Sequence, residues 1–324
     1  MRASQLQLCR LAAAVVALAA CADSKSVVGP TTASSTAVEG KVNPTGPITI
    51  DLPGASRTLA LDINERGEIV GRYTRAGQNH GFLRDARGNI TTIGYPGSSF
   101  SVASSINDRG DILGWYSLPS APAVRHGFVL EHGVFTSFDP PGSTFTNPLG
   151  INNRGEITGR FCMLADCPPP GMGSYHGFLL RDGVYTIIDV PGGNETNAFK
   201  PNELGAIVGG FGENGSEELF VRRYGRFTKI ALPNGKPISQ DDGGINGLGE
   251  IVGTYCDGAP PCLIGPTDNH GFLLVGHQLR TIDVDGATAT ALTAINAQGD
   301  IVGGYTDANG VAHAFLLERR GTSR

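Results

Sequence analysis

A short segment that recurs six times along the chain restricts the possible folds more than any other feature. Its copy at residues 151–159 reads Ile-Asn-Asn-Arg-Gly-Glu-Ile-Thr-Gly; near-copies begin at Ile63, Ile106, Ile245 and Ile295, and a divergent copy begins at Pro201. The asparagine at its second position falls at residues 64, 107, 152, 202, 246 and 296, with spacings of 43, 45, 50, 44 and 50 residues. Periods of this length are typical of β-propeller blades with four strands each.

Each repeat predicts four strands, which we name a to d. Strand a is the apolar segment that enters the Asn, such as residues 291–295, and the Asn-x-x-Gly makes a tight turn because Asn and Gly tolerate positive φ. Strand b is the Ile-Val-Gly-x-Tyr segment, such as residues 301–305, and strand c is a His-Gly-Phe-Leu-Leu block, such as residues 176–180. A turn such as residues 181–183 leads to strand d, rich in Thr, Ile and Val. No segment shows the 3.6-residue period of a helix.

The two ends of the repeat array complement each other. Residues 48–54 form a strand d with no repeat before it, and residues 313–317 form a strand c with no strand d after it. The N-terminal strand d supplies the strand that the last repeat lacks, so the two ends together complete one blade. This indicates ring closure, since a closed ring leaves no exposed strand edge. We therefore expect an all-β chain with one six-bladed β-propeller over residues 46–317, its last blade closed by the N-terminal strand.

The repeats resemble those of the HAF family, whose His-Ala-Phe stands literally at residues 313–315. The resemblance covers about residues 46–317. Members are predicted bacterial extracellular repeat proteins, so the resemblance implies secretion and a repeat fold but no established activity. The fourth repeat departs from the pattern, because Pro201 replaces Ile and Glu218-Leu219-Phe220 replaces His-Gly-Phe.

The N-terminus predicts export. Arg2 and Arg10 precede a ten-residue apolar run that is too short to span a bilayer, and the run ends Leu18-Ala19-Ala20-Cys21. This ending resembles a bacterial lipoprotein signal, which implies cleavage before Cys21 and acylation of that cysteine; the alternative is an ordinary secretory signal with an incidental cysteine. We expect a signal peptide at 1–20, a flexible tether at 21–45 and a short tail at 318–324. The chain is then lipid-anchored in the envelope, at the outer membrane or cell surface.

Composition and motifs exclude several classes of function. The net charge is −5 and charged residues make up 17% of the chain, which is not the basic pattern of a nucleic-acid-binding protein. No Gly-x-Ser-x-Gly, His-Glu-x-x-His or phosphate loop occurs, so we assign no catalytic residue and no cofactor. We expect a monomer.

Several residue types recur at equivalent places, and we interpret them as structural. Histidines begin strand c at residues 80, 126, 176, 270 and 313, and their regular separation argues against one zinc site, so we expect a local hydrogen bond for each. The phenylalanines at 82, 128, 178, 220, 272 and 315 are expected to pack between blades. The repeat Asn and the Asp at 51, 139, 189 and 283 could suggest calcium loops, but each turn offers few oxygens, and turn formation is the preferred interpretation. We predict no metal site.

The connection between strands b and c is where the repeats vary in length. The strand-c histidine follows the repeat Asn by 16, 19, 24, 24 and 17 residues in repeats 1, 2, 3, 5 and 6. The two longest connections hold the cysteine pairs Cys162–Cys167 and Cys256–Cys262, which in an exported protein predict two local disulfides. A joint metal site of the four is the less favoured alternative.

Functional residues tend to lie on loops that a rigid scaffold carries, so we place the ligand site on the face of the b–c loops. The loops 117–125, 162–175 and 256–269 should dominate it, and the candidate ligand-binding residues are Arg72, Trp115, Arg160, Tyr175 and Asp268. Trp115, the only tryptophan, could equally be core or a ligand platform. The predicted function is a non-catalytic binding module for an envelope or extracellular protein or glycan; the alternative is a propeller-type hydrolase or lyase acting on polysaccharide.

Overall fold

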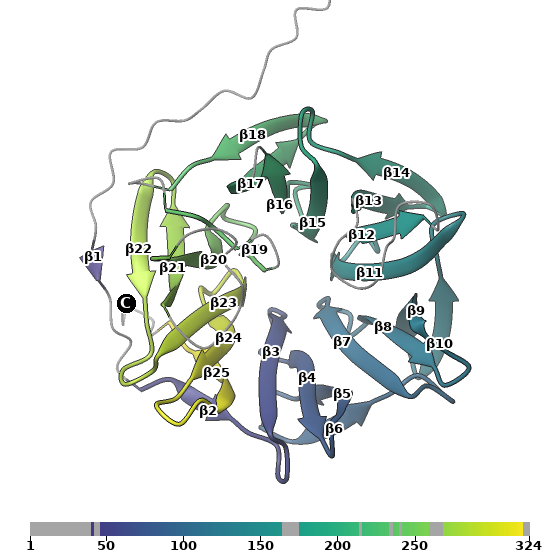
Figure 1. Ribbon diagram of the computed structural model, residues 1–324, viewed down its shortest axis with the longest axis horizontal. Coiled ribbons are helices and arrows are strands. Elements are labelled where there is room, and N and C mark those ends of the chain that lie inside the picture. Colours follow the sequence, from purple (N-terminus) through teal and green to yellow (C-terminus); the bar gives the residue numbers. More distant parts are fainter. Residues whose placement is uncertain are drawn as a thin grey trace, which may run out of the picture.

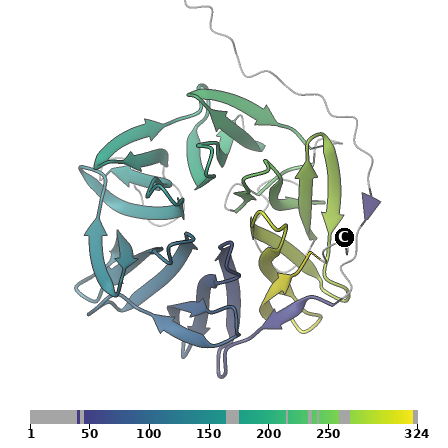
Figure 2. The ribbon, with the colours of Figure 1, turned by 180° about the vertical axis from the view of Figure 1, so that it is seen from behind.

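The computed structural model describes residues 40–41, 46–163, 175–213, 216–232, 236–239, 242–258 and 268–319. Throughout these segments the regular structure is β-strand with no helix, as expected, and the strands surround a central axis (Figure 1). The view from behind shows the same ring (Figure 2). Within these segments, no helix is long and apolar enough to span a membrane.

Antiparallel pairing groups the described strands into six sets of four. The first three sets are β3 (Arg57–Ile63), β4 (Ile69–Arg75), β5 (Gln78–Arg84) and β6 (Ile90–Ile93); β7 (Phe100–Ile106), β8 (Ile112–Leu118), β9 (Ala121–Glu131) and β10 (Val134–Phe138); and β11 (Ser143–Ile151), β12 (Ile157–Met163), β13 (His176–Arg181) and β14 (Val184–Ile188).

The next two sets are β15 (Glu195–Pro201), β16 (Ile207–Glu213), β17 (Ser216–Arg223) and β18 (Arg226–Ile230); and β19 (Gly244–Ile245), β20 (Ile251–Cys256), β21 (Asn269–Val275) and β22 (Gln278–Ile282). The sixth is β23 (Ala289–Ile295), β24 (Ile301–Thr306), β25 (Ala312–Leu317) and β2 (Ile48–Ile50). The short β1 (Gly40–Lys41) pairs in parallel with β22.

A β-bulge in the innermost strand of five sets aims side chains at the axis. The pairing register shifts at Leu61, Ser104, Leu149, Phe199 and Thr293, each three residues before a repeat Asn. A bulge leaves one residue unpaired and reorients its neighbours. Four of these bulge residues, Leu61, Ser104, Leu149 and Thr293, lie at the centre of the ring, and their identities differ from repeat to repeat.

The six repeat asparagines form a closed ring of hydrogen bonds. Each Nδ2 donates to the backbone oxygen of the Asn in the next repeat, at 2.9–3.3 Å, and Asn296 completes the ring by donating to Asn64. Each Oδ1 also accepts from backbone N–H groups in its own turn; that of Asn152 accepts from Arg154 at 3.1 Å and Glu156 at 3.0 Å. The turn-forming interpretation is confirmed for the asparagines, and the link between repeats is an additional role.

The recurring histidines and aspartates are partners of one another. His126, His176, His270 and His313 each place Nδ1 within 2.7–3.1 Å of the Asp that follows strand d of the same set. The local hydrogen bond predicted for these histidines is therefore present, and it fastens strand c to strand d. In the sixth set the partner of His313 is Asp51 of the N-terminal segment.

In the fourth set, where Glu218 replaces His, Lys229 contacts that glutamate at 3.2 Å and Glu213 at 2.8 Å. A lysine-centred ion pair thus takes the place of the His–Asp contact. The divergent repeat keeps the same strand pairing as the others.

The core consists of clusters that join neighbouring sets. All six strand-c phenylalanines are 0% exposed, and each belongs to such a cluster. Phe82, for example, packs with Ala60 of its own set and with Val302 and Ala314 of the sixth set. The prediction that the phenylalanines pack between repeats is confirmed.

Candidate functional site

A cavity of about 610 Å³ lies at the axis, on the face that carries the b–c connections. We call it the axial cavity. Its volume falls within the roughly 300–1,000 Å³ usual for small-molecule sites. Its walls come mainly from the first three sets, through strands β3, β4, β5, β7, β8, β9, β11 and β12, with Thr293 and Asp242 on the opposite side.

Three of the predicted ligand-binding residues line this cavity: Arg72, Trp115 and Arg160. They occupy the same position in β4, β8 and β12, directly after the strand-b glycine. Successive side chains of a strand point to opposite faces. The glycine faces the strand-c phenylalanine, since a Cβ added at Gly71 would lie 2.7 Å from the Phe82 ring, and the residue after it faces the cavity.

Aromatic and cationic side chains of the second and third sets form a continuous stack along one wall. Trp115 stacks on Phe100 with ring centroids 4.8 Å apart. The Arg125 guanidinium lies over both the Trp115 ring, at 4.1 Å, and the Phe145 ring, at 4.5 Å. The stack continues through Tyr175, 5.3 Å from Phe145, to the Arg160 guanidinium at 4.8 Å from the Tyr175 ring.

The position of Trp115 in this stack lies between the two interpretations of the sequence, a core residue and an open ligand platform. Its side chain lines the cavity but is only 6% exposed, because Phe100 and Arg125 cover it. Guanidinium–aromatic contacts of this kind contribute about 0.5–2 kcal/mol each. Trp115 therefore orients Arg125 rather than offering an open ring face to a ligand.

Arg125 is the electrostatic centre of the wall. Burial, together with the neighbouring charges of Arg160 and Arg72, lowers its pKa to about 10. It remains protonated at neutral pH, so three positive charges converge on one region of the cavity. A parallel bridge between Phe145 and Arg125 joins β11 to β9 and holds this side chain at the boundary of the two sets.

Sequence reasoning missed Arg125, Phe145 and the polar groups of Ser104 and Asn147. A signal for Arg125 exists: the residue before the strand-c histidine varies from repeat to repeat, as Asn79, Arg125, Tyr175, Glu217, Asn269 and Ala312. Tyr175 stands at this position and is among the predicted ligand-binding residues, whereas Arg125 falls inside the expected loop 117–125. In the structure β9 begins at Ala121, so that most of this loop is strand.

Asp268 lies apart from the other candidates. It is exposed at the start of β21, with a φ of 66°, and it is not among the residues that line the axial cavity. Most of the loops 162–175 and 256–269 lies outside the described residues. Cys162 and Cys256 are disulfide-bonded, but Cys167 and Cys262 lie outside the described residues, so the two pairings stay predictions.

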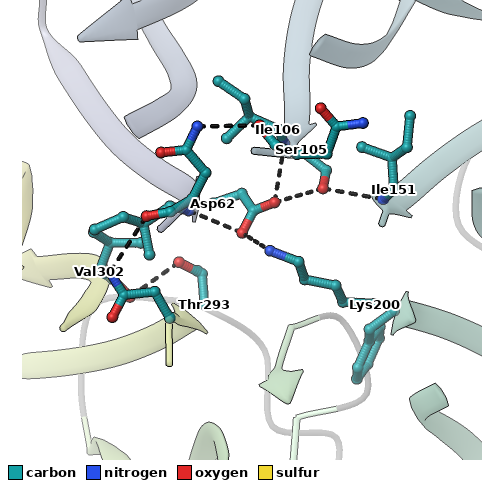
Figure 3. Close-up of polar contacts among 12 residues, drawn as sticks. Asp62, Ser105, Ile106, Ile151, Lys200, Thr293 and Val302 are labelled. Atoms are coloured by element: carbon teal, nitrogen blue, oxygen red, sulfur yellow. Dashed lines mark hydrogen bonds and ion pairs between the residues drawn. The ribbon is translucent and has the colours of Figure 1, made fainter. Parts of the chain in front are cut away.

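A buried ion pair crosses the axis beneath the cavity (Figure 3). Lys200 of β15 and Asp62 of β3, from sets on opposite sides of the ring, place Nζ and Oδ1 2.5 Å apart. Asp62 also accepts hydrogen bonds from the Ser105 hydroxyl at 2.5 Å and the Ile106 backbone N–H at 3.0 Å. The pair lies between the axial cavity and the asparagine ring. Across the described residues, no group of three His, Cys, Asp or Glu could hold a metal ion.

Comparisons with known proteins bear on the fold. No protein-family model matches the chain, and no curated protein sequence matches it. Among solved structures, the β-propeller domain of the Trilobed protease from Pyrococcus furiosus has a TM-score of 0.51 and 12% identity, over 79% of this chain and 78% of that one. TolB from Acinetobacter baumannii has a TM-score of 0.50 and 11% identity, over 82% and 65%.

A streptogramin B lyase has 17% identity over 85% of this chain and 87% of its own, with a TM-score of 0.45. Identities this low establish the fold alone. The chain is an all-β protein with a β-propeller fold.

Proposed function

We propose that residues 46–317 form a six-bladed β-propeller, closed by β2, that acts as a non-catalytic ligand-binding module with its site in the axial cavity. Three contacts between the ends of the chain support closure: β2 pairs with β25, His313 contacts Asp51, and Asn296 donates to Asn64. The scaffold repeats around the axis, whereas the chemistry of the cavity does not.

That one-sided chemistry is the observation that carries the proposal. The position after the strand-b glycine is Arg72, Trp115 and Arg160 in the first three repeats but Gly210, Thr254 and Gly304 in the others. If this position served packing alone, the same residue type would be expected in every repeat. Cationic and aromatic side chains confined to one half of a central cavity are the arrangement of a binding site on a rigid scaffold.

Binding can be tested with the full-length protein in detergent against a panel of glycans and envelope proteins. Arg72→Met and Arg160→Met should each weaken capture of the ligand, because both guanidinium groups line the cavity. Arg226→Met is the matched control, since Arg226 is exposed on the outer strand β18. Binding that both cavity variants leave intact would exclude the axial cavity. Turnover of a bound glycan would replace the binding module with the hydrolase or lyase alternative.

We further propose that the module is held at the envelope by a lipid on Cys21. The support is the sequence of residues 1–21, which lie outside the described residues. Cys21→Ser should move the protein from the membrane fraction to the soluble fraction. Membrane attachment that is unchanged in this variant would refute acylation at Cys21.

A further inference from the structure

The Arg125 guanidinium has donors that the protein does not use. It lies over the Trp115 and Phe145 rings, and contacts of this kind with ring faces do not use the five N–H donors of the guanidinium group. Within the described residues, none of these N–H groups makes a hydrogen bond or an ion pair. A half-buried guanidinium group that stacks on aromatic rings but has unused N–H donors can bind an oxyanion, because an oxyanion accepts hydrogen bonds in the guanidinium plane.

The positions of the neighbouring charges strengthen this interpretation. Arg72 and Arg160 line the same cavity and are close enough to lower the pKa of Arg125. Bringing like charges together raises the free energy of the folded protein, and a bound anion offsets that repulsion.

Other polar groups in the cavity point to hydroxyl groups on the ligand. The Ser104 hydroxyl and the Asn147 side-chain oxygen are buried on residues only 6% and 7% exposed, and both lack a hydrogen-bond partner among the described residues. Buried polar atoms of this kind are ordinarily hydrogen-bonded. Asp242, 7% exposed on the opposite side, disfavours a second negative charge there and favours donors such as sugar hydroxyls.

We propose that the axial cavity binds a uronic-acid type of sugar, with its carboxylate on Arg125 and its hydroxyl groups toward Ser104, Asn147 and Asp242. The inference rests on the proposed binding function and narrows it to an acidic carbohydrate. The cavity volume of about 610 Å³ lies in the range for a small ligand, so the expected ligand is a short oligosaccharide or the end of a longer chain.

Isothermal titration of the full-length protein in detergent tests the ligand class directly. The probes are a trisaccharide of galacturonic acid, the neutral trisaccharide of galactose, galactose 6-sulfate and inorganic phosphate. We expect binding of the galacturonate trisaccharide and at least about 30-fold weaker binding of the neutral one, because the charge-assisted hydrogen bonds to arginine are lost. Tighter binding of the sulfated sugar or of phosphate would overturn the assignment of a carboxylate.

Variants then locate the site. Arg125→Leu should weaken galacturonate binding at least about 30-fold, and Ser104→Ala roughly 2- to 10-fold. Arg226→Leu should leave it unchanged. The melting temperature of Arg125→Leu should stay within about 4 °C of the parent, since removing the buried charge offsets the lost stacking. If it falls further, the variant is destabilised and Ser104→Ala becomes the test of the site.

The outcomes separate this inference from the proposed function. If neutral glycans or an envelope protein bind, and Arg72→Met and Arg160→Met abolish that binding, the cavity is a binding site but its ligand is not an acidic sugar. If galacturonate binds equally to Arg125→Leu and Ser104→Ala, the carboxylate does not lie where we place it. If none of the four probes binds, the acidic-sugar inference fails, and the panel of glycans and envelope proteins decides the proposed binding function separately.

Discussion

At the scale of single residues, the Lys200–Asp62 pair joins two sets that lie on opposite sides of the ring. Asp62 is 1% exposed, so its carboxylate needs a partner in the folded protein. Lys200→Met should lower the free energy of unfolding by about 3–5 kcal/mol, because it leaves a buried charge unpaired. The measurement is urea unfolding at pH 7.

The control is the double variant Lys200→Met, Asp62→Asn, which removes both charges and should recover part of the loss. Recovery is incomplete because an Asn at position 62 replaces one of the two oxygens that accept from Ser105, Ile106 and Ile63. If the single variant is as stable as the parent, the pair does not exist in solution.

Glu156 should make the free energy of unfolding depend on pH in the acidic range. Burial raises its pKa, but hydrogen bonds from Arg154 and Asn152 and the charge of Arg181 outweigh burial, so that the net pKa is below its ordinary value of 4.5. A carboxyl with a lowered folded-state pKa stabilises the protein above the unfolded-state pKa, and that stabilisation is lost as the pH falls through the folded-state pKa.

Glu156→Gln should therefore be less stable than the parent at pH 7, and the difference should shrink as the pH falls from about 4.5. Urea unfolding of both proteins between pH 7 and pH 4 measures this. A difference that stays constant over the whole range would show that Glu156 acts through packing rather than through its charge.

At the scale of elements, β2 decides whether the sixth set is complete. Deleting residues 46–54 exposes the edge of β25 and removes the buried side chains of Ile50 and Leu52, which are 3% and 6% exposed. Burial of two such side chains contributes about 3–6 kcal/mol. We expect aggregation in size-exclusion chromatography and a clear fall in melting temperature.

Ile48→Thr is the control for this deletion. Ile48 lies in the same strand but is 41% exposed, so the variant should remain monodisperse with little change in melting temperature. A deletion that stays soluble and equally stable would contradict closure of the ring by β2.

At the scale of the whole molecule, the asparagine ring connects all six repeats. Asn152→Ala should cost about 2–4 kcal/mol, because it leaves the backbone N–H groups of Arg154 and Glu156 without a partner and removes the hydrogen bond from Asn152 to the buried Glu156 carboxylate. Asn202→Ala should cost less, since its turn has Ala206 where the others have a carboxylate. Urea unfolding measures both; equal losses would show that the Asn–carboxylate contact adds nothing.

The sequence by itself determined the strand order of each repeat, from the period, and the complementary ends of the repeat array. Local geometry sets the strands, their turns and their buried faces, through the repeat Asn, the strand-b Gly and the strand-c Phe. Each repeat contains all three residues, so one repeat is enough to predict its own local structure. The same logic found Arg72, Trp115 and Arg160, because a position that varies within a fixed frame is visible when the repeats are aligned.

Only the tertiary structure decided which varying positions meet. Arg125 lies against Phe145 through a single bridge between two sets, and Lys200 reaches Asp62 across 138 residues of sequence and the full width of the axis. A bulge before five of the six repeat Asn residues directs side chains toward the centre of the ring, but no repeat contains information about the side chain that approaches from the opposite side. Such contacts depend on how many sets surround the axis and on their order around it, which no single repeat encodes.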